Sequence, residues 1–178
     1  MKKLRDQSGF SLVESLCAVI VLLLVSAVIM TGSRLAADTF SRSVSVSEAQ
    51  VLCSTLKTVI ADELRSTGTV FVDESGYLEG IFSTHYGISA GNMSSFGAVS
   101  HDGSPAAVGE LTLGGEKLLS SSAYTYGARA SVSVSYAEEE NCFTATLTVY
   151  DGEGREIKTT EFDVMPVKAP AVNRVGAG

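Results

Sequence analysis

Hydrophobic residues follow three different patterns along the chain, and each pattern predicts a different kind of structure. Nearly every residue in Leu16–Met30 is apolar. Over Ala49–Leu64 the apolar residues recur at three- and four-residue steps, the period of one face of an amphipathic helix. Beyond Thr69 apolar and polar residues alternate in short runs, as they do in antiparallel strands. The sequence therefore predicts an α+β fold with one long N-terminal helix and a β-rich head.

The helix is expected to run from about Ser11 to Ser66. Gly32 and Ser41–Ser47 are two places where it is weak, since Gly costs about 1 kcal/mol relative to Ala in a helix. Gly68 is a typical stop signal. The apolar face of the outer half must be buried against the head, because an isolated helix has no partner for it. That face, the helical stripe, consists of Ala49, Leu52, Cys53, Leu56, Ile60 and Leu64.

Turn residues separate the predicted strands. Residues 69–73 and 77–82 flank a hairpin-like turn, and residues 111–113 and 116–119 flank a Gly-Gly pair, which is a strong two-residue turn signal. The clearest alternation predicts a three-stranded antiparallel meander over 128–136, 143–149 and 157–164, with one buried and one wet face. We expect an antiparallel sheet of about four to six strands whose buried face packs on the helical stripe.

The N-terminal apolar run is long enough to cross a membrane. The 19 uncharged residues between Glu14 and Arg34 would span about 28 Å as a helix, against about 30 Å for the hydrocarbon core. Lys2, Lys3 and Arg5 precede the run, so the N-terminus should stay cytoplasmic and the head should lie outside.

Glu14 does not fit an ordinary membrane anchor. A carboxylate in this position costs free energy to insert, and intramembrane ionisable residues are functional candidates. A positive charge at the same depth would be its natural partner. The free amine of Phe10 would supply that charge if the chain were cut between Gly9 and Phe10, and the amine would be largely protonated at neutral pH.

The N-terminal residues also resemble a known signal. After a short basic leader and before the apolar run, the chain reads Gly9-Phe10-Ser11-Leu12-Val13-Glu14-Ser15-Leu16. This stretch closely resembles the class III signal of type IV prepilins, and the resemblance covers about the first 35 residues. It implies that a prepilin peptidase cleaves after Gly9 and methylates the amine of Phe10, and that Glu14 is the assembly carboxylate.

Two other interpretations of the N-terminus are open. A conventional secretory signal would need a small-x-small cleavage site beyond the apolar run, and Ile29–Gly32 offers nothing convincing. In a plain single-pass anchor, Gly9 and Glu14 would be accidental. The prepilin hypothesis explains both residues.

The resemblance divides the chain into a leader (1–9), a transmembrane helix (10–33), its amphipathic continuation (34–66), a β-rich head (67–165) and a flexible tail (166–178). It implies a structural subunit, a minor pilin or pseudopilin, of a type IV pilus-like, competence or type II secretion filament. Its partners would be prepilin peptidase, other pilin or pseudopilin subunits and the cytoplasmic membrane. The alternative is a membrane-tethered adhesin or ligand-binding module that acts through an irregular head loop, Tyr86–Pro105.

Charge argues against nucleic-acid binding. The formal net charge is −7, and removing the predicted leader, which carries +2, leaves −9. Phosphate contacts need clustered Lys and Arg, so we expect no direct nucleic-acid binding. Cys53 and Cys142 would form a disulfide or lie as two small buried residues, and the sequence leaves both open.

Other chemical motifs are weak. Gly87-Ile88-Ser89-Ala90-Gly91 matches the G-x-S-x-G elbow but lacks its strand–helix context. His85 and His101 have no metal-ligand cluster around them, and Glu138–Glu140 reads as a solvated turn. We expect no catalytic residue, no metal and no cofactor.

Overall fold

The structure is a computed structural model that describes residues 12–82 and 93–175. The chain divides into two compact units, Met1–Ser43 and Val44–Gly178. The division falls inside the long helix, so the predicted segment borders at 33/34 and 66/67 do not coincide with it. The predicted leader, 1–9, lies outside the described residues.

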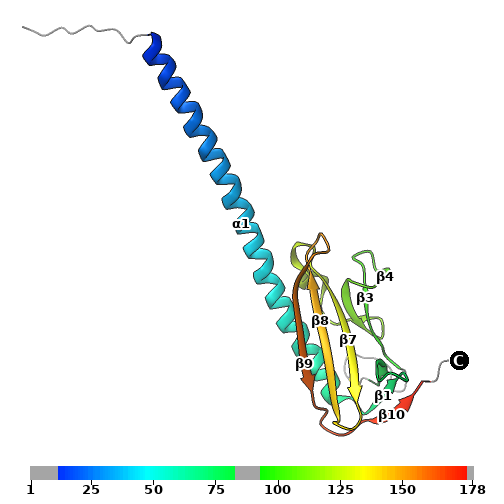
Figure 1. Ribbon diagram of the computed structural model, residues 1–178. Coiled ribbons are helices and arrows are strands. Elements are labelled where there is room, and N and C mark those ends of the chain that lie inside the picture. The colour runs from blue at the N-terminus through cyan, green and yellow to red at the C-terminus, as the bar shows by residue number, and fades with distance from the viewer. Residues whose placement is uncertain (1–11, 83–92, 176–178) are drawn as a thin grey trace, which may run out of the picture. The chain divides into compact units, whose positions relative to one another are not determined.

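One unbroken helix, α1, runs from Leu12 to Ser66 (Figure 1). The prediction of a helix beginning near Ser11 and ending at Ser66 is confirmed, and both weak places, Gly32 and Ser41–Ser47, are helical. The hydroxyls of Thr31 and Thr39 donate to the carbonyls four residues earlier, at 2.9 and 2.7 Å. These polar side chains are therefore satisfied within the helix.

Ten strands and two short 3-10 helices follow α1. Their bounds are β1 Thr69–Val72, β2 Leu78–Ile81, β3 Phe96–Val99, β4 Pro105–Ala106, β5 Glu110–Leu113, β6 Glu116–Lys117, η1 Ser121–Ala123, η2 Thr125–Gly127, β7 Arg129–Ala137, β8 Cys142–Tyr150, β9 Glu156–Val164 and β10 Ala171–Arg174.

The strands form three small sheets, which corrects the prediction of one antiparallel sheet of four to six strands. The sheet orders are β10-β1-β2, β4-β3-β5-β6 and β7-β8-β9. Single bridges link them, including Tyr77 to Ser135 and Gly109 to Ala130. The pairing of β1 with β10 is parallel. Period-two patterns identify strands but do not say which of them are neighbours, and that is why the division was missed.

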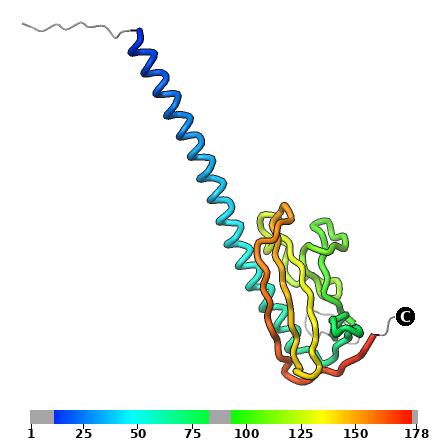
Figure 2. The backbone as a smooth tube through the Cα atoms, viewed as in Figure 1, coloured from blue at the N-terminus to red at the C-terminus, as the bar shows by residue number. Residues whose placement is uncertain are grey.

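The predicted meander and its packing on the helical stripe are confirmed. β7, β8 and β9 are nine residues long and pair antiparallel in the order β7-β8-β9, and Figure 2 shows them as three adjacent runs. All six stripe residues are buried in one core with the inner face of the meander. Cys53 Sγ lies 3.4 Å from Thr160 Oγ1 of β9, and Lys57 Nζ lies 5.1 Å from the centre of the Phe162 ring.

The prediction of an irregular loop over Tyr86–Pro105 is wrong over Phe96–Val99, whereas residues 100–104 form a turn. Phe96–Val99 is an inner strand that pairs with both β4 and β5. The strand was not predicted because this segment is rich in Ser and Gly, which are typical of loops. Gly97 fits there because a Cβ atom would come within 3.3 Å of Thr112 Oγ1.

The predicted flexible tail is also wrong over β10. Ala171–Arg174 pairs with β1, and the amides of Val167 and Ala171 donate to the carbonyls of Arg65 and Gly68 at 2.9 Å. The two prolines of the tail, Pro166 and Pro170, suggested an extended mobile end. Both are buried, so they precede a docked strand and do not mark disorder.

Candidate functional site

Glu14 lies in the first turn of α1 and is exposed. A carboxylate in this turn is favoured by the positive end of the helix dipole. Gly9 and Phe10 lie outside the described residues, so the predicted pairing of Glu14 with the Phe10 amine stays a prediction. α1 begins at Leu12 and gives Glu14 a fixed helical frame next to the predicted cut.

Beyond Glu14, the part of α1 in the first unit is not buried by any of the described residues. Every residue of Leu12–Ser43 is exposed, and large apolar side chains there range from 48% exposed at Ile20 to 85% at Leu12. A helix that is apolar all round is normally buried, in a membrane or among other helices. By length and composition alone, α1 qualifies as a membrane-spanning helix.

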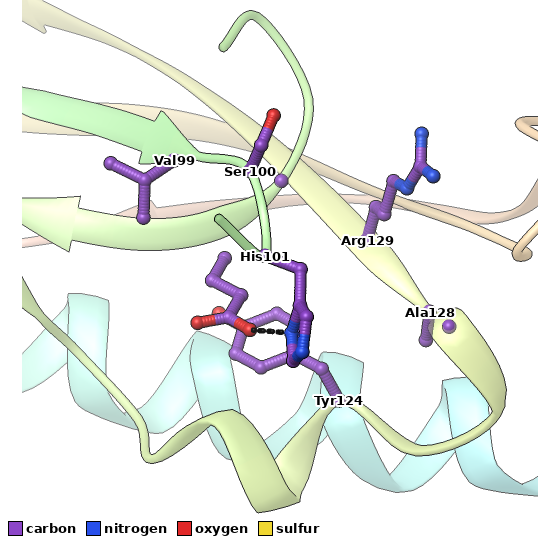
Figure 3. A pocket seen from close by; sticks show the side chains of 9 residues that line it. Val99, Ser100, His101, Tyr124, Ala128 and Arg129 are labelled. Atoms are coloured by element: carbon purple, nitrogen blue, oxygen red, sulfur yellow. Dashed lines mark hydrogen bonds and ion pairs between the residues drawn. The ribbon is translucent and has the colours of Figure 1, made fainter. Parts of the chain in front are cut away.

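A second candidate site is a cleft of about 180 Å³ in the head. Figure 3 shows its side chains around His101, whose ring is directed at the Glu110 carboxylate, while the Arg129 guanidinium points away. The lining residues are Val99, Ser100, His101, Gly109, Glu110, Tyr124, Gly127, Ala128 and Arg129.

Glu110 is the buried charge of this cleft, with its side chain 7% exposed. Lys117 Nζ lies 2.6 Å from Oε2, and the hydroxyl of Ser121 donates to the same oxygen at 2.8 Å. His101 Nδ1 lies 3.4 Å from Oε1. Burial raises the pKa of the Glu110 carboxyl, but the hydrogen bonds from Lys117, Ser121 and His101 outweigh it and hold the pKa below its ordinary value. Glu110 is therefore ionised at neutral pH.

Tyr124 forms the floor of the cleft and is also buried. Its hydroxyl oxygen accepts a hydrogen bond from the Leu111 amide at 2.8 Å. Burial, reinforced by the nearby Glu110 charge and opposed by the Leu111 hydrogen bond, raises the pKa of Tyr124 to about 12. The phenol thus stays protonated.

These contacts give the cleft a structural role. The Glu110 carboxylate is contacted by Lys117, Ser121 and His101. The hydrogen bond between the Tyr124 hydroxyl and the Leu111 amide connects the segment of η1 and η2 to β5. Sequence reasoning missed both residues. One signal was available for Glu110: the Gly114-Gly115 turn folds β6 back beside β5, which brings Lys117 opposite Thr112 and within reach of Glu110.

The remaining candidates from the sequence give no second site. The G-x-S-x-G motif and His85 lie outside the described residues. Glu138–Glu140 is an exposed turn between β7 and β8, as predicted. Within residues 12–82 and 93–175, no group of three His, Cys, Asp or Glu side chains is placed to hold a metal.

All three cysteines are free thiols. Cys53 and Cys142 are buried, and Cys17 is exposed on the apolar part of α1. Of the two possibilities left open by the sequence, the structure therefore has the pair of small buried residues and not the disulfide.

Comparison with known proteins bears on the N-terminus. Residues 4–30 match the family model described as the prokaryotic N-terminal methylation motif, which is the type IV prepilin signal. No curated protein and no solved structure matches the chain. The motif implies a prepilin peptidase substrate and is typical of structural proteins. Together with the long apolar helix it fits anchoring in a membrane.

Proposed function

We propose that this chain, which carries the type IV prepilin signal, is a structural subunit of a type IV pilus-like, competence or type II secretion filament. Prepilin peptidase would cut the precursor between Gly9 and Phe10 and methylate the new amine. The observation that carries the proposal is the match at residues 4–30, which overlaps the start of α1, together with the exposure of every apolar side chain in Leu12–Ser43.

The exposed helix explains why the chain needs other copies. Burial of apolar surface is worth about 25 cal/mol per Å², so Leu12–Ser43 is stable in lipid before assembly and among neighbouring helices afterwards. The protein would first sit in the cytoplasmic membrane as a single-pass chain with its N-terminus inside and its head outside. Assembly would then carry it into a filament outside the membrane.

Glu14 would set the register of assembly. A carboxylate in an apolar filament core is costly unless it is paired. The methylated amine of Phe10 on a neighbouring copy keeps its positive charge and would neutralise Glu14. That pairing would fix the axial stagger between adjacent helices.

Two features favour a minor pilin or pseudopilin. Leu16–Ser33 has no proline, which many main pilins carry in this helix, and the head lacks a disulfide loop because its cysteines are free. The alternative, an adhesin that binds through residues 86–105, stays a prediction; Phe96–Val99 of that segment is an inner strand. The net charge gives no support to direct nucleic-acid contact.

The proposal is tested by expressing the full chain with and without a prepilin peptidase and measuring its intact mass. With the enzyme, we expect loss of residues 1–9 and addition of one methyl group on Phe10. Gly9→Val should block the cut, whereas Ser8→Ala, the matched control one residue earlier, should be processed. A wild-type chain that stays intact beside an active peptidase would refute the proposal.

Glu14 is tested in the bacterium that makes the chain. Glu14→Ala should be cut and methylated but missing from sheared filaments, because the Phe10 amine of its neighbour would be left unpaired. Glu14→Asp, which keeps the charge on a shorter side chain, should recover part of the incorporation. Normal incorporation of Glu14→Ala would remove the assembly role while leaving the processing intact.

A further inference from the structure

A groove runs along the part of α1 that belongs to the head unit. Its volume is about 200 Å³, and one wall is the helix while the other is the segment from β6 to η2. Its floor and walls combine apolar side chains with one carboxylate. The lining residues are Glu48, Val51, Leu52, Thr55, Leu119, Ser122, Ala123 and Thr125.

Hydrogen bonding and backbone packing fix the outer wall. Thr125 Oγ1 donates to Glu48 Oε2 at 3.0 Å and so ties η2 to α1. The next residue, Tyr126, has a φ of 54°, which is rare for a bulky residue. The turn after β8 packs against this residue: a Cβ atom on Gly152 would come within 3.1 Å of the carbonyl oxygen of Tyr126. The groove is thus preformed.

Large apolar side chains border the groove in the free chain. Val51 is 60% exposed on the helix wall, and Tyr126 is 71% exposed. A smaller adjoining hollow shares Glu48 and Thr125 with the groove and includes Tyr126 in its lining. Rigid exposed tyrosines beside apolar hollows are typical of interface anchors.

The other unit of the chain offers a segment of matching chemistry. Phe40 is 72% exposed and lies about 9 Å along the helix beyond Arg34, where the uncharged run ends. Arg34 and Arg42 form no ion pair with any of the described residues. This segment, Arg34–Arg42, therefore combines an exposed aromatic side chain with two free cations, and the groove combines an apolar floor with Glu48.

We propose that the groove of one copy receives the Arg34–Arg42 segment of a second copy of this chain. Phe40 would pack on Val51, Leu119 and Ala123, and an arginine would pair with Glu48. The inference rests on the proposed function and on two copies of this chain being neighbours in the filament, an arrangement that brings α1 of one copy beside the head of the other. It adds a specific contact outside the apolar run.

The test replaces Phe40 with the photocrosslinker p-benzoylphenylalanine, which keeps an aromatic group at that position. The full chain is expressed in the bacterium that produces it, sheared filaments are irradiated, and the adducts are mapped by mass spectrometry. We expect a crosslinked dimer joined to residues 119–123 or to Val51 of the second copy. The matched control carries the photocrosslinker at Leu35, which is also exposed but lies on a different face of α1, and should give no adduct in the groove.

A second variant checks the groove itself. Val51→Asp changes an exposed side chain, so the head should fold normally, and it should abolish the Phe40 adduct. Adducts of Phe40 with lipid, with another protein or with a different surface of the second copy would overturn the inference. An unprocessed chain would instead refute the proposed function, so the two failures are distinguishable by intact mass.

Discussion

The two parts of α1 belong to one continuous helix but meet different surroundings. Every residue of Leu12–Ser43 is exposed, whereas Val44–Ser66 buries a stripe of six apolar residues against the head. Within the first part, Leu16–Met30 is apolar on nearly all faces, whereas the second part is apolar on one face only. The distribution of apolar residues around the helix, and not helix propensity, therefore decides which partner each part needs.

This comparison separates two kinds of stability. The second part is stabilised by contacts within its own chain. The first part has no such contacts among the described residues, so under the proposed function its stability depends on lipid or on other copies. Equivalent substitutions in the two parts should have different effects, and the predictions below use this difference.

The largest difference is expected for leucine-to-alanine changes. Leu56 is fully buried, and Leu56→Ala should lower the free energy of unfolding of the head by about 2–5 kcal/mol, because it leaves a cavity in the core. Leu22 is 65% exposed, and Leu22→Ala should change it by less than about 0.5 kcal/mol. Urea unfolding of the full chain in detergent measures both. Equal losses of unfolding free energy in the two variants would contradict the claim that only the second part of α1 is stabilised by contacts within its own chain.

A charge in the first part should disturb the membrane and leave the head intact. Ile20→Lys should cost about 3 kcal/mol of insertion free energy and reduce the share of the chain found in the membrane fraction. Val51→Lys adds the same charge at an exposed position of the second part and should leave membrane retention unchanged. Retention of Ile20→Lys at the wild-type level would argue against a membrane span.

A smaller effect is expected in the head cleft. Glu110→Gln should destabilise the head by about 1–3 kcal/mol, because Lys117 and Ser121 lose a charged acceptor. Since the folded-state pKa of Glu110 lies below its unfolded value, its contribution is present above pH of about 4.3 and is lost as the pH falls through the folded pKa. The difference in unfolding free energy between wild type and Glu110→Gln should therefore shrink below that pH. A difference that grew there would contradict the assigned direction.

The smallest expected effect is that of a reductant. Because Cys53 and Cys142 are free thiols, dithiothreitol should not change the melting temperature of the head. A thiol count of the unfolded, unreduced chain should find all three cysteines. A fall in melting temperature on reduction would reveal a disulfide.

The regular parts of the fold were predictable because each carries a repeated pattern. The helical stripe and the meander follow periods of about 3.6 and 2 residues, and all six stripe positions are buried. β3 and β10 were missed because they are four residues long and carry glycine, serine or flanking proline. Their strand character comes from neighbours that are distant in sequence, Leu111 for Ala98 and Val70 for Val172.

Buried polar residues were equally hard to predict. Glu110 is buried because Lys117 and Ser121 surround it, and Glu63 is buried on α1 next to the predicted apolar stripe. Sequence patterns treat both as surface residues. The N-terminal site, in contrast, could be predicted from the sequence alone. Its residues are contiguous, so the motif is recognised without any structure.

The most direct test of the account is the N-terminus of the chain in filaments sheared from the organism that makes it. The account predicts that the chain begins at a methylated Phe10 and that no peptide from residues 1–9 is present. A chain that begins at Met1, or filaments from which the chain is absent while it accumulates uncut in the membrane, would contradict it.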